Sequence, residues 1–220
     1  MLAPALGAPK LEAYILAASA AQKPRVCYLG TASGDDPSYL TRFYDTYANL
    51  HCTPSHVPLF RRTPVDLRTT LLNNDIIHVG GGNTRSMLAV WRHWNIDTIL
   101  REAWESGIIL CGSSAGAICW FEQGLTDSID VDLTPMTCLG FLPGSACPHY
   151  DGEPDRRPAY QHLIATGALS NGYAADDAAA LHFINRDFQA AVTARPKAHA
   201  YRVTSTNGGI EETTLETRLL

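Results

Sequence analysis

The stretch "IILCGSSAGA", Ile108 to Ala117, is an apolar run that ends in glycines, alanines and two serines. A short apolar run closed by a glycine predicts a β-strand. Gly112, Ser114 and Gly116 fit the pattern Gly-x-Ser-x-Gly, in which small flanking residues permit a tight turn that exposes the serine hydroxyl. The pattern assigns that position to Ser114 rather than Ser113. The other interpretation is a small-residue turn in which a serine only caps the next helix.

Two segments near this turn could supply backbone N–H groups to an oxyanion. The residues "AGAICWFE", 115–122, predict a helix whose N-terminal amides and positive dipole end point towards Ser114. The segment "GGGN", Gly80 to Asn83, lacks the spacing and the Gly-Lys-Ser/Thr ending of nucleotide-binding loops. Its bare backbone can approach a substrate and donate an N–H, while Asn83 caps the following helix.

Strands and helices alternate along the first half of the chain. The pattern predicts strands at 25–32, 56–60, 75–82 and 108–112, and helices at 36–50, 64–72, 83–94 and 96–107. This alternation predicts an α/β fold with a mostly parallel central sheet and helices on both faces. A loop-rich segment follows at 124–158, and such long loops are often functional. A helix at 159–169 and strands at 180–184, 188–194 and 199–205 complete the prediction.

Composition is typical of a soluble globular protein. The 220 residues are 45% hydrophobic, so we expect one domain over residues 1–220 that needs no metal or disulfide to fold. A net charge of −5 without a basic cluster argues against nucleic acid as a partner. No apolar run approaches the roughly 20 residues of a membrane span. The six cysteines form no Cys-x-x-Cys pair, so we expect reduced core thiols in a cytoplasmic protein without cofactor.

A serine nucleophile needs a base, and eight histidines are candidates. His149 stands apart because "CPHYDGE" places it in the loop-rich segment, after a proline that restrains the backbone. A base must in turn be oriented by an acid. Asp176 and Asp177 precede a predicted strand, and Asp127 is a competing acid nearer to Ser114 in the sequence.

The motifs "GGGNT", "GSSAGA", "PHYDGE" and "ADDAAAL" stand in the order and approximate spacing of a known family. From about Arg25 to Phe183 the chain resembles the peptidase E (aspartyl dipeptidase) family, serine peptidases on a class I glutamine amidotransferase-like fold. The resemblance implies a three-layer sandwich with Ser114 as nucleophile, His149 as general base and Asp177 as acid. It implies an oxyanion hole formed by the backbone of Gly81, Gly82 and Ala115.

The chain departs from the family pattern around these motifs. Ser113 stands where aspartyl dipeptidase has Trp, and Asp177 stands where it has Glu as the triad acid. The family's segment after the histidine begins Gly-Glu-Thr-Arg, whereas "GEPDRRPAY" displaces Arg156 and Arg157. A guanidinium binds a carboxylate through two parallel hydrogen bonds, so we expect one of the pair to hold a substrate aspartate. The alternative is a solvated pair at a helix start.

The predicted activity is serine-dependent hydrolysis of short peptides, with dipeptides that begin with aspartate as substrates. A glutaminase is disfavoured because the turn carries Ser114, whereas Cys111 lies earlier in the strand. The alternatives are a cyanophycinase-like hydrolase of β-aspartyl linkages, an α/β-hydrolase esterase, and a small-molecule binding module without catalysis. The esterase order would combine Ser114 with Asp127 or Asp130 and with His182 or His199. We expect a small peptide as partner, with no membrane or nucleic acid, and the sequence leaves a homodimer open.

Overall fold

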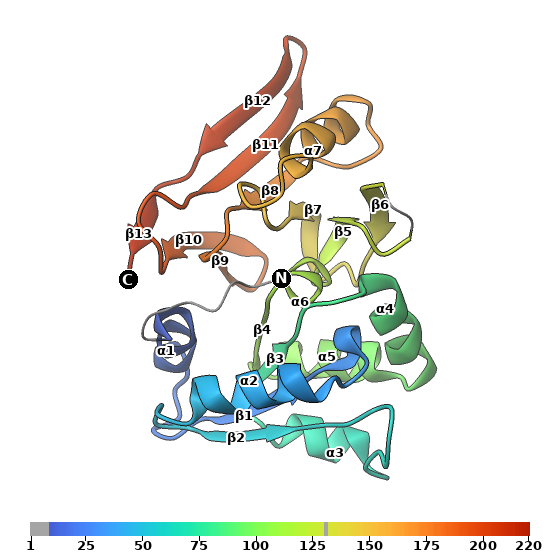
Figure 1. Ribbon diagram of the computed structural model, residues 1–220, viewed down its shortest axis with the longest axis vertical. Helices are drawn as coiled ribbons and strands as arrows, with labels where there is room; N and C mark the ends of the chain where they lie inside the picture. The colour runs from blue at the N-terminus through green and yellow to red at the C-terminus, as the bar shows by residue number, and fades with distance from the viewer. Residues whose placement is uncertain (1–8, 130–131) are drawn as a thin grey trace. The chain divides into compact units, whose positions relative to one another are not determined.

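The computed structural model describes residues 9–129 and 132–220 and confirms the α/β class with parallel strands (Figure 1). The chain divides into two compact units, one that ends at Ala117 and one from Ile118 to Leu220. The first unit contains one β-sheet and the second contains two, and each unit has helices of its own. The assignment of residues 1–220 to one domain stays a prediction.

The first unit is built on a parallel four-stranded sheet with the strand order β2-β1-β3-β4. Its strands are β1 (Arg25–Leu29), β2 (Thr53–His56), β3 (Ile76–Val79) and β4 (Ile109–Gly112). The prediction was wrong for the second strand, which was expected at 56–60. Pro54 lies within β2, where pairing with β1 alone leaves one edge of the strand free of ladder bonds. A proline inside a strand obscures the sequence signal at this position.

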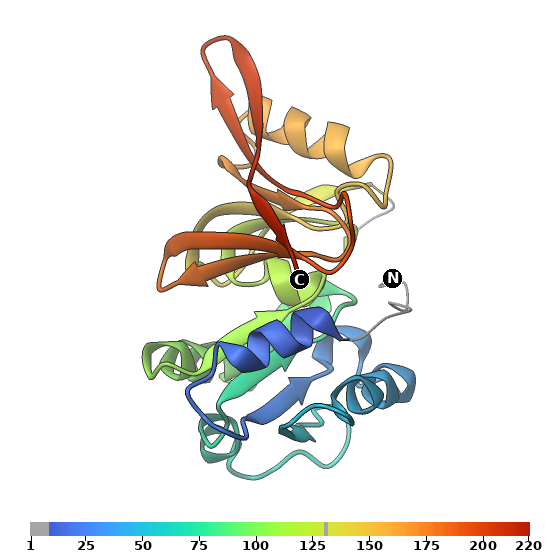
Figure 2. The same ribbon diagram turned by 90° about the vertical axis from the view of Figure 1, so that its left-hand side faces the viewer.

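Helices cover both faces of this sheet, as Figures 1 and 2 show for α2 and α5. The helices are α1 (Lys10–Ala17), α2 (Pro37–Tyr47), α3 (Leu67–Leu72), α4 (Thr84–His93) and α5 (Ile96–Glu105), with a short 3-10 turn η1 (Thr31–Ser33). Asp36 and Asn83 cap α2 and α4 by accepting hydrogen bonds from the N–H groups of Ser38 and Ser86. The predicted cap at Asn83 is therefore confirmed.

The helix expected at 115–122 is much shorter than predicted. Helix α6 spans only Ala115–Ile118, and strand β5 begins at Phe121. The Phe121 ring contacts the rings of Tyr173 and Phe183, with centroids 6.3 and 5.7 Å away. These long-range contacts override the local helix preference, which is why the sequence pattern misplaces the boundary.

The second unit contains a six-stranded sheet with the order β12-β11-β8-β7-β5-β6 and a three-stranded sheet β13-β10-β9. Strands β5, β7 and β8 are parallel, and the outer pairs are antiparallel. The bounds are β5 (Phe121–Thr126), β6 (Thr134–Thr137), β7 (Leu142–Cys147), β8 (Gly172–Ala175), β9 (Ala179–Ile184), β10 (Asp187–Thr193), β11 (Ala200–Thr206), β12 (Gly209–Thr214) and β13 (Thr217–Leu219).

The segment expected to be loop-rich carries more regular structure than its composition indicates. It contains β6 and β7, which are short and include Pro135 and Pro143, as well as the start of α7 (Arg156–Ala165). Tyr160 and Ile164 of α7 pack in the core of this unit with Leu125. No helix among the described residues is long and apolar enough to cross a membrane.

Candidate active site

Ser114 lies in the turn between β4 and α6, and its backbone adopts the left-handed conformation, with φ 53°. A Cβ at Gly112 would lie 2.4 Å from the carbonyl oxygen of Gly116, and one at Gly116 would lie 2.2 Å from that of Val79. Neither position can accept a side chain without moving backbone. Both flanking glycines are therefore required by the turn that places the strained Ser114 conformation at its apex.

The glycine loop after β3 lies beside this serine. A Cβ at Gly81 would be 3.1 Å from the Ser114 Cβ, and the next residue, Gly82, has φ 136°, a conformation that favours glycine. Within residues 9–129 and 132–220, the N–H groups of Gly81 and Gly82 donate to no other backbone carbonyl. Ala115 is the first residue of α6, where an N–H has no partner inside the helix. The structure thus brings Gly81 and Ser114 together in the first unit.

A pocket in the first unit opens onto the same residues. It is lined by Gly80, Gly81, Gly82, Ser113 and Ser114 together with side chains from α1, α2, β1 and β3, namely Glu12, Tyr28, Tyr39, Arg42, Phe43, Thr46, Tyr47 and His78. The α2 residues among them recur at the spacing of one helix face. This periodicity was the available sequence signal for the pocket wall, which the motif analysis missed.

Three side chains that line the pocket, Tyr28, Tyr47 and His78, are neutral polar groups. Burial lowers the pKa of His78 to about 4, and its Nδ1 lies 3.0 Å from the Tyr47 hydroxyl. Burial also raises the pKa of Tyr28 to about 12. Tyr28 stacks on Phe43 with ring centroids 4.7 Å apart. These three side chains therefore supply hydrogen-bonding groups but no net charge at neutral pH.

In the second unit, His149 is hydrogen-bonded to Asp177. The His149 Nδ1 atom lies 2.6 Å from the Asp177 Oδ1 atom, and the histidine side chain is only 7% exposed. His149 also has a left-handed backbone, with φ 55°. The N–H of Asp177 donates to Asp151 Oδ1 at 2.8 Å, and Asp151 forms an ion pair with Arg195. The carboxylate thus holds one ring nitrogen of a buried imidazole, which fixes the ring and leaves the other nitrogen for chemistry.

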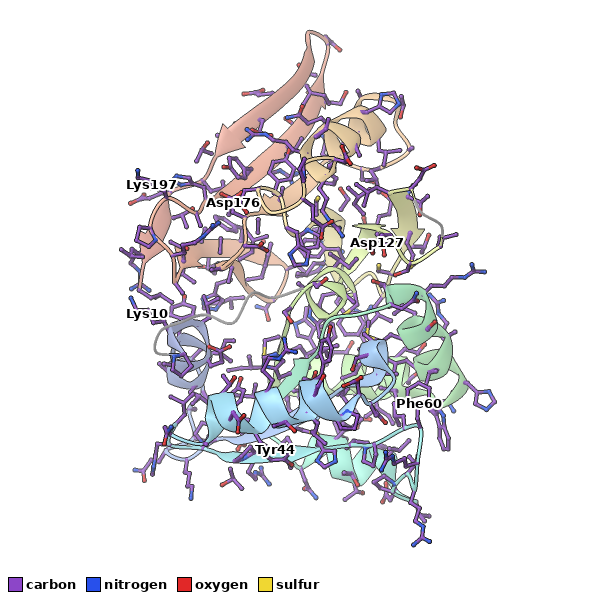
Figure 3. The ribbon with its side chains drawn as sticks, viewed as in Figure 1. Lys10, Tyr44, Phe60, Asp127, Asp176 and Lys197 are labelled. Carbon is purple, nitrogen blue, oxygen red and sulfur yellow. The ribbon has the colours of Figure 1, made fainter. Side chains whose placement is uncertain are left out.

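The other two candidate acids, Asp127 and Asp176, are labelled in Figure 3 and have partners other than His149. Asp176 accepts hydrogen bonds from the His199 N–H and, at 3.3 Å, from the Tyr201 hydroxyl, and burial raises its pKa. The exposed Asp127 carboxylate lies 3.7 Å from the Arg156 guanidinium. Asp130 lies outside the described residues. Of the three acids considered for the base, Asp177 is the one that contacts His149.

Carboxylates of the same unit neutralise both arginines that follow His149. Arg156 is buried and donates to Glu153 at 2.5 Å and to the carbonyl of Leu125 at 3.4 Å. Arg157 forms an ion pair with Glu212 and lies over the rings of Tyr150 and Tyr201. The structure therefore gives each guanidinium a role inside the protein, and substrate recognition by Arg156 or Arg157 stays a prediction.

Cys111, the thiol nearest to Ser114 in the sequence, is poorly suited to act as a nucleophile. Burial raises its pKa to about 12, and its Sγ lies 3.7 Å from the carbonyl oxygen of Ile77. A thiol must lose its proton to attack, so Cys111 is inert at neutral pH. Across residues 9–129 and 132–220, no group of three His, Cys, Asp or Glu side chains could hold a metal ion.

Comparison with known proteins places these features in context. Residues 7–191 match the model of Peptidase family S51. The chain is 52% identical over 210 residues to "Uncharacterized peptidase YgaJ" of Bacillus subtilis (strain 168), covering 96% of this chain and 91% of that protein. It is 31% identical over 125 residues to "Peptidase E" of Shewanella amazonensis, covering 56% of this chain and 51% of that protein. The crystal structure of a peptidase from an acI-B1 Actinobacterium superposes with a TM-score of 0.65 at 17% identity, covering 97% of this chain and 90% of that one.

Proposed function

This chain belongs to Peptidase family S51, and we propose that it is a serine peptidase that hydrolyses short peptides through an acyl-enzyme on Ser114. Membership confirms the resemblance drawn from the motifs and makes the chain a peptidase. The serine mechanism and the preference for an N-terminal aspartate are our proposal. The relative named Peptidase E and the order of the four motifs support both.

The observation that carries the proposal is the turn at Ser114. A left-handed, non-glycine residue between two glycines that tolerate no side chain is costly, and such strain clusters at functional sites. A turn that only connected β4 to α6 could place a glycine at this position without that cost. The strained turn is best explained by a functional need to expose the Ser114 hydroxyl.

In the proposed mechanism, His149 accepts the Ser114 proton at Nε2 while the hydroxyl oxygen attacks the peptide carbonyl carbon. Asp177 holds the imidazole through Nδ1 and stabilises the imidazolium that forms. Backbone N–H groups of Gly81, Gly82 and Ala115 stabilise the oxyanion of the tetrahedral intermediate. The imidazolium then protonates the leaving amine, and a water molecule, deprotonated by His149, hydrolyses the ester on Ser114.

Labelling with a fluorophosphonate probe tests the nucleophile directly. We expect the wild type to be labelled, Ser114→Ala to lose both labelling and dipeptide hydrolysis, and Ser113→Ala to keep most of both. His149→Ala should retain the fold and lose turnover. A Ser114→Ala variant that keeps more than about a tenth of the wild-type kcat/KM, a loss below ~1.4 kcal/mol, would overturn the assignment. Absence of labelling and turnover in the wild type would favour a binding module without catalysis.

A further inference from the structure

We propose that Arg42 binds a carboxylate of the peptide substrate in the pocket beside Ser114. This inference rests on the proposed function and names the residue that recognises the acidic substrate. The pocket belongs to the first unit alone and contains the reacting hydroxyl, the glycine loop and the inner face of α2. Among its described lining residues, Arg42 is the only permanent cation and Glu12 the only carboxylate.

Arg42 is held in place but not neutralised. Its guanidinium lies 4.9 Å from the centroid of the Tyr39 ring, one turn earlier on α2. No carboxylate of the described residues lies within ion-pair distance of it. The acid nearest to it in the sequence, Asp45, is exposed one turn later on α2 and forms no ion pair with it among the described residues. Asp35 accepts hydrogen bonds from the backbone of residues 59 and 60, and Asp36 caps α2.

Several other arginines differ from Arg42 because a carboxylate pairs with them. Arg25, Arg68, Arg156, Arg157 and Arg195 each form an ion pair with a carboxylate of their own unit. Arg42 forms no such ion pair among the described residues, so its guanidinium donors can bind a ligand. Arg42 keeps its five N–H donors available at the mouth of a pocket with aromatic walls. That arrangement suits bidentate binding of a substrate carboxylate.

Glu12 adds a second constraint on the ligand. Its carboxyl group lines the same pocket, and burial raises its pKa. A cation beside it would favour the charged form, and the free α-ammonium of a peptide is such a cation. A pocket with one guanidinium and one carboxyl group complements a short peptide that carries both a free amino terminus and a carboxylate. The carboxylate can come from an aspartate side chain or from the carboxyl terminus.

Substrate pairs distinguish these two sources. Asp-Leu, Asn-Leu, Ala-Leu and Asp-Leu-amide are compared on the wild type, Arg42→Gln and the control Arg92→Gln, which changes an exposed arginine of α4 outside the pocket. We expect Arg42→Gln to lower kcat/KM for Asp-Leu by about 10- to 100-fold, the range for hydrogen bonds to a charged group. Loss of the Asp-over-Asn preference identifies the side chain as the source. Loss of the preference for the free acid over the amide identifies the carboxyl terminus.

A binding measurement separates this inference from the proposed mechanism. Asp-Leu is titrated calorimetrically into Ser114→Ala and into Ser114→Ala combined with Arg42→Gln, so no turnover is needed. Weaker binding by the double variant supports the role of Arg42 even if the nucleophile is assigned wrongly. Equal binding by the two variants, or loss of acid preference in Arg156→Ala or Arg157→Ala instead, would overturn the proposal. Unchanged fluorophosphonate labelling of Arg42→Gln shows that the variant is folded.

Discussion

Adding one methyl group at Gly152 should disable the site by displacing its acid. A Cβ there would lie 2.3 Å from the Asp177 Oδ2 atom, whereas ordinary contact begins at 3.4 Å. We expect the carboxylate to shift by about 1 Å, which is enough to break its 2.6 Å contact with His149. A misplacement of ~1 Å costs about 10²-fold, and complete loss of the acid about 10⁴-fold. We expect Gly152→Ala to lower kcat by a factor between these limits, roughly 2.7 to 5.4 kcal/mol in the activation free energy.

The assay follows dipeptide hydrolysis alongside thermal unfolding. Gly152 is exposed and has no left-handed φ, so alanine should leave the melting temperature nearly unchanged. Gly208→Ala is the matched control, because the nearest atom to a Cβ there is 3.9 Å away. If the methyl group acts through the acid, adding Gly152→Ala to Asp177→Ala should cause no further loss. Full activity of Gly152→Ala, or additive losses in the double variant, would refute the role given to Asp177.

Two further predictions concern titratable groups. Asp177→Asn should lower kcat by several orders of magnitude, because it removes the charge that holds His149. Asp176→Asn should stay active, because an amide oxygen can still accept the hydrogen bond from the His199 N–H. Reversed effects in the hydrolysis assay would assign the role of the acid to Asp176. His78 has a folded pKa of about 4, below its ordinary 6.5, so the unfolded chain binds the proton first as the pH falls. The free energy of unfolding contributed by neutral His78 should therefore decrease as the pH falls from 6.5 to about 4, by at most ~3 kcal/mol. Urea unfolding of wild type and His78→Gln at several pH values measures this, and parallel pH curves would contradict it.

The alternating half of the fold was predictable because its signals are local. Apolar runs define β1, β3 and β4, and helical spacing with a capping side chain defines α2 and α4. The strands of the second unit were harder to predict, because β6 and β7 are short and interrupted by proline. Their pairing with β5 stabilises them, and such long-range pairing leaves little trace in a local pattern.

In the candidate site, too, the residues fixed by local sequence were predictable and those fixed by long-range folding were not. The Gly-x-Ser-x-Gly pattern identified Ser114 because two glycines and a positive φ are local demands of one turn. The choice of Asp177 over Asp176 could not come from local sequence, since the two are adjacent. It came from the resemblance, and in the structure the 2.6 Å contact with His149 belongs to Asp177, while Asp176 bonds to His199 and Tyr201. Adjacent residues after a strand point in different directions, so only the three-dimensional course of β8 and its neighbours separates them.

Arg42 shows what charge counting along a sequence cannot reveal. Arg156 and Arg157 drew attention because they follow His149 as a pair, yet their partners are Glu153, just before α7, and Glu212 in β12. Arg42 is a single cation on a helix, and its sequence neighbourhood contains more acids than bases. Whether an arginine can receive a substrate depends on which carboxylates reach it after folding. The sequence places Asp45 one helical turn from Arg42, and the folded structure shows that the two form no ion pair.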